Sequence, residues 1–88
     1  MKAVVDVERH IMVIGGELHA DEEQLLLERG SKQEHLWGVN LYPDLMTPDW
    51  LEFDSMINLQ PSQGNRSRSV EDPALQARIR SVVSSLIA

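Results

Sequence analysis

Two short stretches hold the residues whose types and spacing could do chemistry. The first is GELHADE, in which Glu17, His19 and Asp21 recur at every second position. In a strand, residues two apart project from the same face, so these three side chains would form a cluster. Carboxylate and imidazole groups bind zinc and other divalent ions, which makes the cluster a candidate metal site. Because this spacing is common by chance, we favour a solvated or hydrogen-bonded group and expect no bound metal or cofactor.

The second stretch is SQGNRSR, which supplies amides, hydroxyls and two guanidinium groups. Gly64 and Asn65 can adopt left-handed conformations that turn successive backbone amides toward one anion. Phosphate, sulfate or a partner's carboxylate could bind there. The structural alternative, which we favour, pairs an arginine of this loop with Asp54 or Glu52. The candidate binding residues are Gln63, Asn65, Arg66 and Arg68.

Neither stretch carries a catalytic signature. Asp54 and Ser55 are neighbours in a predicted strand and point to opposite faces, so they cannot serve as a local base and nucleophile. The sequence also contains no GxSxG turn and no glycine-rich phosphate loop. We therefore assign no catalytic residue and favour a non-enzymatic binding or regulatory module that acts through contact with a protein partner.

Two other functions stay open at this point. A small enzyme or metal protein would be built around Glu17 and His19. An RNA-binding or anion-binding module would use the arginines of the second half of the chain, and its affinity for RNA would fall steeply with salt. Those arginines are Arg66, Arg68, Arg78 and Arg80.

Composition indicates one folded domain over residues 1–88, with a net charge of −6. Residues 1–59 carry four cationic and twelve acidic side chains, whereas residues 60–88 carry four arginines and two acids. The acidic body disfavours nonspecific binding to nucleic acid or to anionic lipid. The chain has no cysteine, no apolar run long enough to span a membrane and no leader of the secretory type, so we expect a cytoplasmic protein.

Hydrophobic periodicity predicts an α+β fold, an antiparallel sheet of about four strands with a C-terminal helix on one face. A period of two marks the strands, and a short link at Arg9 and His10 favours a hairpin between the first two. The second strand is a continuous apolar run that we expect to be buried on both faces. The predicted strands cover residues 2–8, 11–16, 36–42 and 51–60.

Two helices are expected beside the sheet. Residues 21–29 begin with acids and are followed by Gly30, which favours a short helix over the alternative of a strand. At the C-terminus, Asp72 can cap a helix whose first position is Pro73. Its apolar stripe consists of Leu75, Ile79, Val82, Val83 and Leu86.

Five stretches together resemble a family of small bacterial proteins known only as a domain of unknown function: KAVVDVE, IGGELHADEE, LWGVNLYPD, EFDSMIN and PSQGNRSRSVEDP. The resemblance spans nearly the whole chain and implies no activity, cofactor or catalytic residue. It also implies a helical segment ahead of KAVVDVE, so either the start is truncated or another element covers that face of the sheet. Because one C-terminal helix covers only one face, we expect a homodimer that buries Val4 and Met12, or the face of Trp37.

Overall fold

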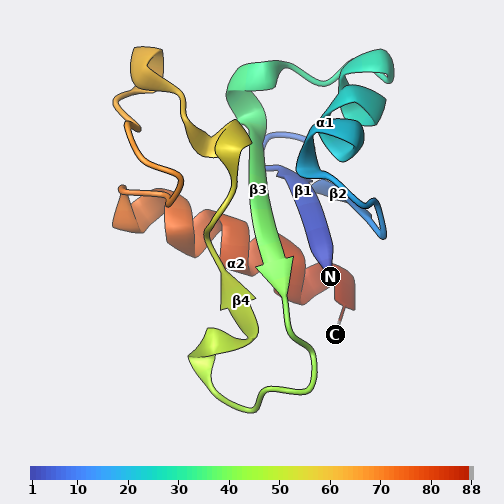
Figure 1. The fold of residues 1–88 in the computed structure, drawn as a ribbon, viewed down its shortest axis with the longest axis vertical. Helices are drawn as coiled ribbons and strands as arrows, with labels where there is room; N and C mark the ends of the chain where they lie inside the picture. Colours follow the sequence, from blue (N-terminus) through green and yellow to red (C-terminus); the bar gives the residue numbers. More distant parts are fainter. Residues whose placement is uncertain (88) are drawn as a thin grey trace.

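The structure is a computed structural model that describes residues 1–87. A four-stranded antiparallel sheet lies between two helices, which confirms the predicted α+β class (Figure 1). The strands lie in the order β2-β1-β3-β4, so the first strand of the chain is central. The elements are β1 (Lys2–Asp6), β2 (Ile11–Ile14), α1 (His19–Glu28), β3 (Leu36–Leu41), β4 (Leu51–Glu52) and α2 (Pro73–Ile87).

The predicted hairpin joins β1 and β2, with Val4 opposite Val13 in the antiparallel register. Asp6 holds the turn, because its Oδ1 accepts hydrogen bonds from the backbone amides of Glu8 and Arg9, both at 2.9 Å. At the far end of β2, Gly15 has φ +86° and turns the chain away from the sheet. The expectation that this second strand is buried on both faces is wrong, because β2 is an edge strand whose residues are half-buried or exposed.

Each face of the sheet is covered by one helix. Val4 packs with Leu26 of α1 and with Leu36 in the smaller core cluster. Val5 belongs to the larger cluster on the opposite face, where α2 packs. The larger cluster contains Ala3, Val5, Val7, Trp37, Val39, Leu41, Leu51, Val70, Ile79, Val82 and Val83.

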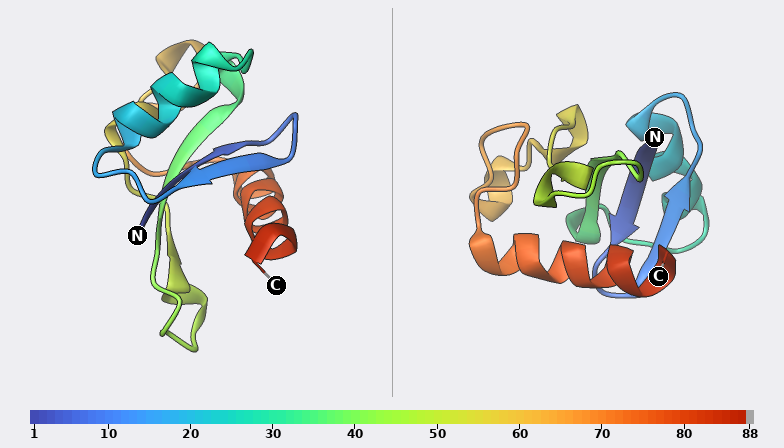
Figure 2. Two further views of the ribbon diagram at one scale, coloured as in Figure 1. Left: turned by 90° about the vertical axis from the view of Figure 1, so that its right-hand side faces the viewer. Right: turned by 90° about the horizontal axis from the view of Figure 1, so that it is seen from below.

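The dimer surface predicted from the sequence is wrong for two of its three residues, Val4 and Trp37. Val4 and Trp37 are 0% and 2% exposed within one chain, so neither is available to a second copy. The prediction assumed that one helix covers one face and that the other face stays open. Instead, α1 supplies the second cover (Figure 2). Met12, the third residue named for that surface, is half-buried and packs against the larger core cluster.

The helix expected over residues 21–29 is confirmed, and the alternative of a strand is wrong. The helix α1 begins two residues earlier, at His19, and ends at Glu28. Gly30, at φ +96°, follows the C-terminal end as predicted, and the amide of Ser31 closes that end on the carbonyl of Leu26 at 3.0 Å.

The C-terminal helix α2 also forms as predicted. Asp72 Oδ1 accepts a hydrogen bond from the amide of Ala74 at 2.9 Å, which caps the first turn. Most of the apolar stripe faces the sheet, with Ile79 fully buried, whereas Leu86 is 48% exposed. Across residues 1–87, neither helix combines the length and the apolar character that crossing a membrane requires.

The strand predicted over residues 51–60 is wrong beyond its first two residues. After Glu52 the chain still follows the edge of β3, but side-chain amides replace the backbone ladder. Asn58 Oδ1 accepts from the amide of Gly38 at 2.8 Å, and its Nδ2 donates to the carbonyl of Gly38 at 3.0 Å. Gln60 Nε2 donates to the carbonyl of Leu36 at 3.0 Å. A carboxamide offers the same donor and acceptor as a peptide unit, so the edge of β3 is satisfied without a strand.

Candidate functional site

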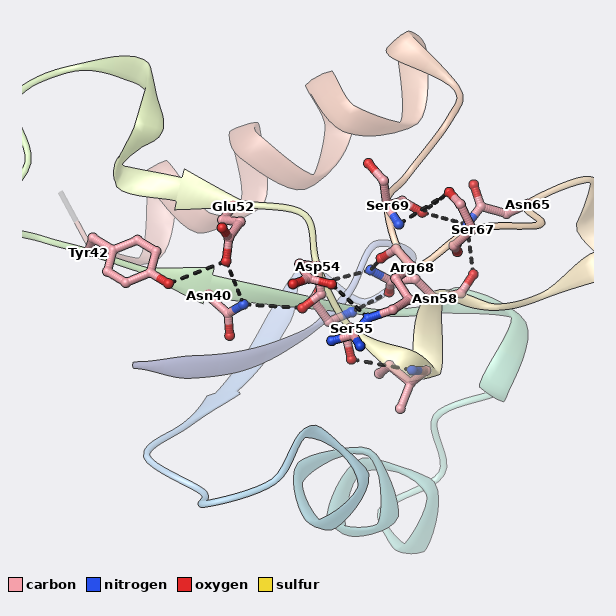
Figure 3. Close-up of polar contacts among 12 residues, drawn as sticks. Asn40, Tyr42, Glu52, Asp54, Ser55, Asn58, Asn65, Ser67, Arg68 and Ser69 are labelled. Carbon is pink, nitrogen blue, oxygen red and sulfur yellow. Dashed lines mark hydrogen bonds and ion pairs between the residues drawn. The ribbon is translucent and has the colours of Figure 1, made fainter.

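Asn65 is the centre of the polar loop between the end of β4 and α2 (Figure 3). It is 5% exposed, and its Nδ2 donates to the carbonyls of Asn58 and Ser69, both at 2.7 Å, and of Ser67 at 3.2 Å. Its Oδ1 accepts from the amide of Glu71 at 2.8 Å. The whole carboxamide is therefore engaged in closing the loop.

The other three predicted binding residues of this loop do not converge on one point. Gln63 Nε2 donates to the carbonyl of Glu34 at 3.0 Å and to Gln60 Oε1. Arg66 is exposed, and its backbone amide donates to Glu71 Oε2 at 2.8 Å. The predicted site therefore divides into a buried closure at Asn65 and outward-facing side chains.

Arg68 forms the ion pair that the structural alternative predicted. Its Nε donates to Asp54 Oδ1 at 2.8 Å, with the side chains 56% and 46% exposed (Figure 3). An ion pair this exposed stabilises the fold by at most about 1 kcal/mol, because solvent screens it and both side chains lose rotamer freedom. The guanidinium Nη groups make no hydrogen bond within residues 1–87, so Arg68 keeps donors for a ligand.

Arg68 stands at the rim of a hollow that we call the His19 cleft. It has a volume of about 310 Å³ and lies between the start of α1, the end of β3 and the segment 54–57. Asn40 fixes that segment beside β3, because its Nδ2 donates to Glu52 Oε1 at 2.9 Å and to the carbonyl of Asp54 at 3.1 Å. The lining residues are Lys2, Leu18, His19, Ala20, Asn40, Asp54, Ser55, Met56, Ile57 and Arg68.

The floor of the His19 cleft is polar and tightly packed. His19 and Ser55 are 7% and 2% exposed and both lie against Gly38 of β3. A Cβ atom at Gly38 would lie 2.6 Å from Ser55 Oγ and 3.1 Å from His19 Cδ2, so only glycine admits both side chains. His19 Nε2 hydrogen-bonds to the carbonyl of Val39 at 2.8 Å.

The surroundings of the His19 imidazole favour its neutral form. Burial lowers its pKa, and the hydrogen bond to the Val39 carbonyl opposes this effect only in part. A neutral ring that meets a carbonyl through Nε2 must carry its proton there, so Nδ1 is left as an acceptor. The cleft floor therefore presents neutral hydrogen-bonding groups below a charged rim.

The rim of the His19 cleft combines apolar side chains with an excess of positive charge. Leu18 and Met56 are 58% and 63% exposed, which is high for side chains of this size. The ammonium group of Lys2 makes no hydrogen bond within residues 1–87, and Arg68 adds a second cation against the single carboxylate of Asp54. The cleft is thus locally cationic on a chain whose net charge is −6.

The candidate metal-binding cluster of GELHADE does not assemble within residues 1–87. Because α1 begins at His19, Glu17 and Asp21 do not share a strand face with the imidazole. Within residues 1–87, no group of three or more histidine or carboxylate side chains is arranged to hold a metal ion. Of the three predicted ligands, only His19 lines the cleft, and its Nε2 meets a backbone carbonyl.

Sequence reasoning missed most of the cleft. Lys2, Leu18, Asn40 and Met56 were not named as site residues, and no motif unites them, because they come from four separate segments. The one usable indication was Met56, which stands alone as an apolar residue on the polar side of the alternation over residues 51–60. An exposed apolar side chain at such a position suggests a contact surface.

Comparison with known proteins agrees with the resemblance noted from the sequence. Neither the curated proteins nor the solved structures give a match to this chain. A family model described as protein of unknown function (DUF5674) matches residues 1–86, which is nearly the full length. The chain therefore belongs to the family described as protein of unknown function (DUF5674).

Proposed function

We propose that this protein is a binding module whose His19 cleft takes a short peptide segment of a partner protein. The segment would place an apolar side chain between Leu18 and Met56 and a carboxylate beside Lys2 and Arg68. One observation carries the proposal: exposed apolar side chains and two cations with unused donors surround a single hollow of about 310 Å³.

The rim favours a ligand that carries both an apolar side chain and a carboxylate over a ligand that carries only one of them. Burial of one aliphatic side chain contributes about 1.5–3 kcal/mol. A charge-assisted hydrogen bond from Arg68 or Lys2 contributes up to about 3 kcal/mol more. Because binding also immobilises the peptide, a single such contact supports a weak and reversible interaction. This is the behaviour expected of a regulatory contact.

The polar groups of the floor are better placed to shape the cleft than to catalyse a reaction. His19 Nε2 is bound to the carbonyl of Val39, and Ser55 Oγ accepts from the amide of Ile57 at 3.3 Å. The carboxylate of Asp54 is held by Arg68 rather than by the imidazole. These contacts orient each group through the backbone or through a surface ion pair, which supports recognition rather than nucleophilic chemistry.

The remaining arginines disfavour the RNA-binding alternative, because they are dispersed. Arg78 Nη2 donates to the carbonyl of Val7 at 3.3 Å. Arg80 donates to the carbonyl of Pro48 at 3.2 Å and lies over the ring of Phe53, 5.3 Å from its centroid. Both guanidinium groups thus contact their own chain on the α2 side, away from the lining of the His19 cleft.

A small carboxylate that carries one apolar side chain tests this proposal directly. N-acetyl-leucine should shift the amide NMR signals of residues 18–20 and 54–57 on titration into the labelled protein. N-acetyl-leucinamide has the same side chain without the charge, so it should bind at least about threefold more weakly. Equal binding of both compounds would contradict a role for the two cations in binding. Signal shifts confined to other residues would contradict binding in the cleft.

Two arginines of one loop provide a matched pair of variants. Arg68→Ala removes a rim cation and should weaken N-acetyl-leucine binding about fivefold or more, because one charge-assisted hydrogen bond is lost. Arg66→Ala removes the same charge from an exposed position outside the cleft lining and should leave the affinity unchanged. Equal losses in the two variants would indicate a nonspecific effect of net charge and would contradict the proposal.

A further inference from the structure

The outer edge of β2 carries backbone groups that nothing in residues 1–87 pairs. In the ladder with β1, Val13 lies opposite Val4, and the amide of Gly15 donates to the carbonyl of Lys2 at 3.4 Å. Because paired residues alternate along an antiparallel ladder, the amides and carbonyls of Met12 and Ile14 point away from β1. They make no other hydrogen bond in the described chain.

The two edges of this sheet differ in whether other groups of the chain cover their backbone amides and carbonyls. Side-chain amides cover the edge of β3 beyond β4, as described above, whereas β2 has the sequence IMVI, with no charged residue or proline. Natural proteins usually protect an exposed edge with such residues, with a bulge or with a covering segment. The left view of Figure 2 shows β2 facing the viewer, with α1 above the strand and α2 below it. An edge left in this state is suited to pair with another strand.

Apolar side chains flank the free edge of β2 on both faces of the sheet. Toward α2 there is a hollow of about 360 Å³ lined by β2 and the end of the helix. Three of its side chains, those of Ile14, Leu86 and Ile87, are 48%, 48% and 46% exposed. Toward α1, a hollow of about 230 Å³ includes Val13 and Leu25, and the side chain of Leu25 is 38% exposed. A strand added at this edge would therefore bury apolar surface on both of its sides.

We propose that β2 pairs antiparallel with β2 of a second copy of this chain, which joins the two sheets across a two-fold axis. The axis passes beside Val13, so that Met12 of each copy lies opposite Ile14 of the other. This register uses all the free groups of both strands and forms four backbone hydrogen bonds, because each such pair exchanges two. A register centred on Met12 would leave Ile14 opposite His10, whose amide already donates to the carbonyl of Asp6.

Charge complementarity favours a second copy of the chain in this orientation. Arg9 precedes β2 and Glu17 follows it, and both are exposed. With Val13 on the axis, the end of β2 that follows Arg9 in one copy lies toward the end that precedes Glu17 in the other, and the two-fold axis repeats this arrangement. A parallel arrangement would bring like charges together. Residues of opposite charge at the two ends thus make the uncharged edge self-complementary in the antiparallel sense only.

Sedimentation equilibrium of the full chain tests the dimer. The wild-type protein should show a concentration-dependent monomer–dimer equilibrium. Ile14→Lys places a charge in the interface and should raise the dimer Kd about tenfold or more, because the ammonium group would be buried without a partner. Leu45→Lys likewise replaces an aliphatic side chain, one of nearly equal exposure (47%) in the loop after β3, and should leave the Kd unchanged. A wild-type protein that stays monomeric at about 1 mM, or equal effects of both substitutions, would overturn the proposal.

The absence of cysteine from the chain allows a direct test of the register. Val13→Cys places one thiol from each copy at the axis, in a non-hydrogen-bonded pair whose Cα atoms lie about 4.5 Å apart, within the range of a disulfide. Mild oxidation should therefore give a covalent dimer. Met12→Cys places the thiol opposite Ile14 of the other copy and should not crosslink efficiently. Efficient crosslinking of Met12→Cys and not of Val13→Cys would overturn the register.

Discussion

Glu22 is a buried carboxyl group whose two oxygen atoms have different surroundings. It is 2% exposed, and its Oε2 accepts from the amide of Gly16 at 3.0 Å, whereas Oε1 is buried without a hydrogen-bond partner. Burial raises the pKa of Glu22, the Gly16 hydrogen bond and Lys2 lower it, and Asp21 raises it further. Folding thus makes protonation of this carboxyl easier than it is in the unfolded chain.

The raised pKa of Glu22 predicts how stability depends on pH. The preference of the folded state for the protonated carboxyl adds to the free energy of unfolding. This added stability is fully present below the ordinary pKa of 4.5 and is lost as the pH rises through the higher folded-state value. Glu22→Gln is neutral at every pH and should melt at a higher temperature than wild type at pH 7, with the difference shrinking toward pH 4. Thermal melts at several pH values measure this, with Glu34→Gln, which changes an exposed residue, as the control. A variant less stable than wild type at pH 7 would contradict the prediction.

At the scale of single elements, the backbone of Gly38 at the edge of β3 depends on one side chain, that of Asn58. Asn58 is 0% exposed, and besides its two bonds to Gly38 its Nδ2 donates to the carbonyl of Arg68 at 2.9 Å. The same amide therefore ties the strand to the loop that carries the rim of the His19 cleft. A change at Asn58 should affect both the stability of the sheet and the shape of the cleft.

Asn58→Ala leaves the buried amide and carbonyl of Gly38 without partners. We expect the free energy of unfolding to fall by about 2–4 kcal/mol, because an unsatisfied buried backbone group costs about 1–3 kcal/mol. Chemical denaturation measures the loss. The matched variant is Asn40→Ala, whose bonds to Glu52 and Asp54 are at the surface, so its loss should be about 1 kcal/mol or less. Similar losses in the two variants would show that the buried carboxamide of Asn58 does not stabilise the fold more than a carboxamide at the surface does.

The same elements explain how far the sequence could predict the fold. Helix α2 was predictable because its cap, first-turn proline and apolar stripe are local features. The strand over residues 51–60 was not, because its alternating pattern also suits a chain that satisfies β3 through Asn58 and Gln60. Alternation specifies which face of a segment is buried, but not whether backbone or side-chain amides complete the ladder.

The candidate site was less predictable than the fold, because the segments that line it are far apart in the sequence. The loop at Asn65 could be identified from its composition, and the pairing of Arg68 with Asp54 was the favoured alternative. The His19 cleft, in contrast, arises only where α1 and the segment 54–57 approach β3. No local pattern encodes such a meeting of segments, and a single sequence supplies no information on which of them will be adjacent.

At the scale of the whole molecule, the His19 cleft and the free edge of β2 belong to different surfaces. The cleft is lined from β3, the start of α1 and the segment 54–57, whereas the edge is lined from β2, α1 and the end of α2. The two sets of lining residues share no member. Self-association would therefore leave both clefts of a dimer open, and each dimer would present two of them.

This separation predicts that the two proposed interactions, ligand binding in the His19 cleft and pairing of β2, are independent. Ile14→Lys should weaken the dimer and leave the affinity for N-acetyl-leucine within about twofold of the wild-type value, because no residue lines both surfaces and effects at separate sites are nearly additive. An NMR titration of the variant, at a concentration where the wild type is dimeric, measures this. A larger change in affinity would show that the edge of β2 and the cleft are coupled.

The central position of β1 also affects how the chain folds during synthesis. Its residues leave the ribosome before those of α2, yet Val5 packs with Ile79 and Val83 in one cluster, and Arg78 donates to the carbonyl of Val7. The large core therefore cannot close until residues 73–87 have been synthesised. Until then, the β1–β2 hairpin exposes apolar surface and two free strand edges, a state in which nascent chains are prone to aggregate or to bind chaperones.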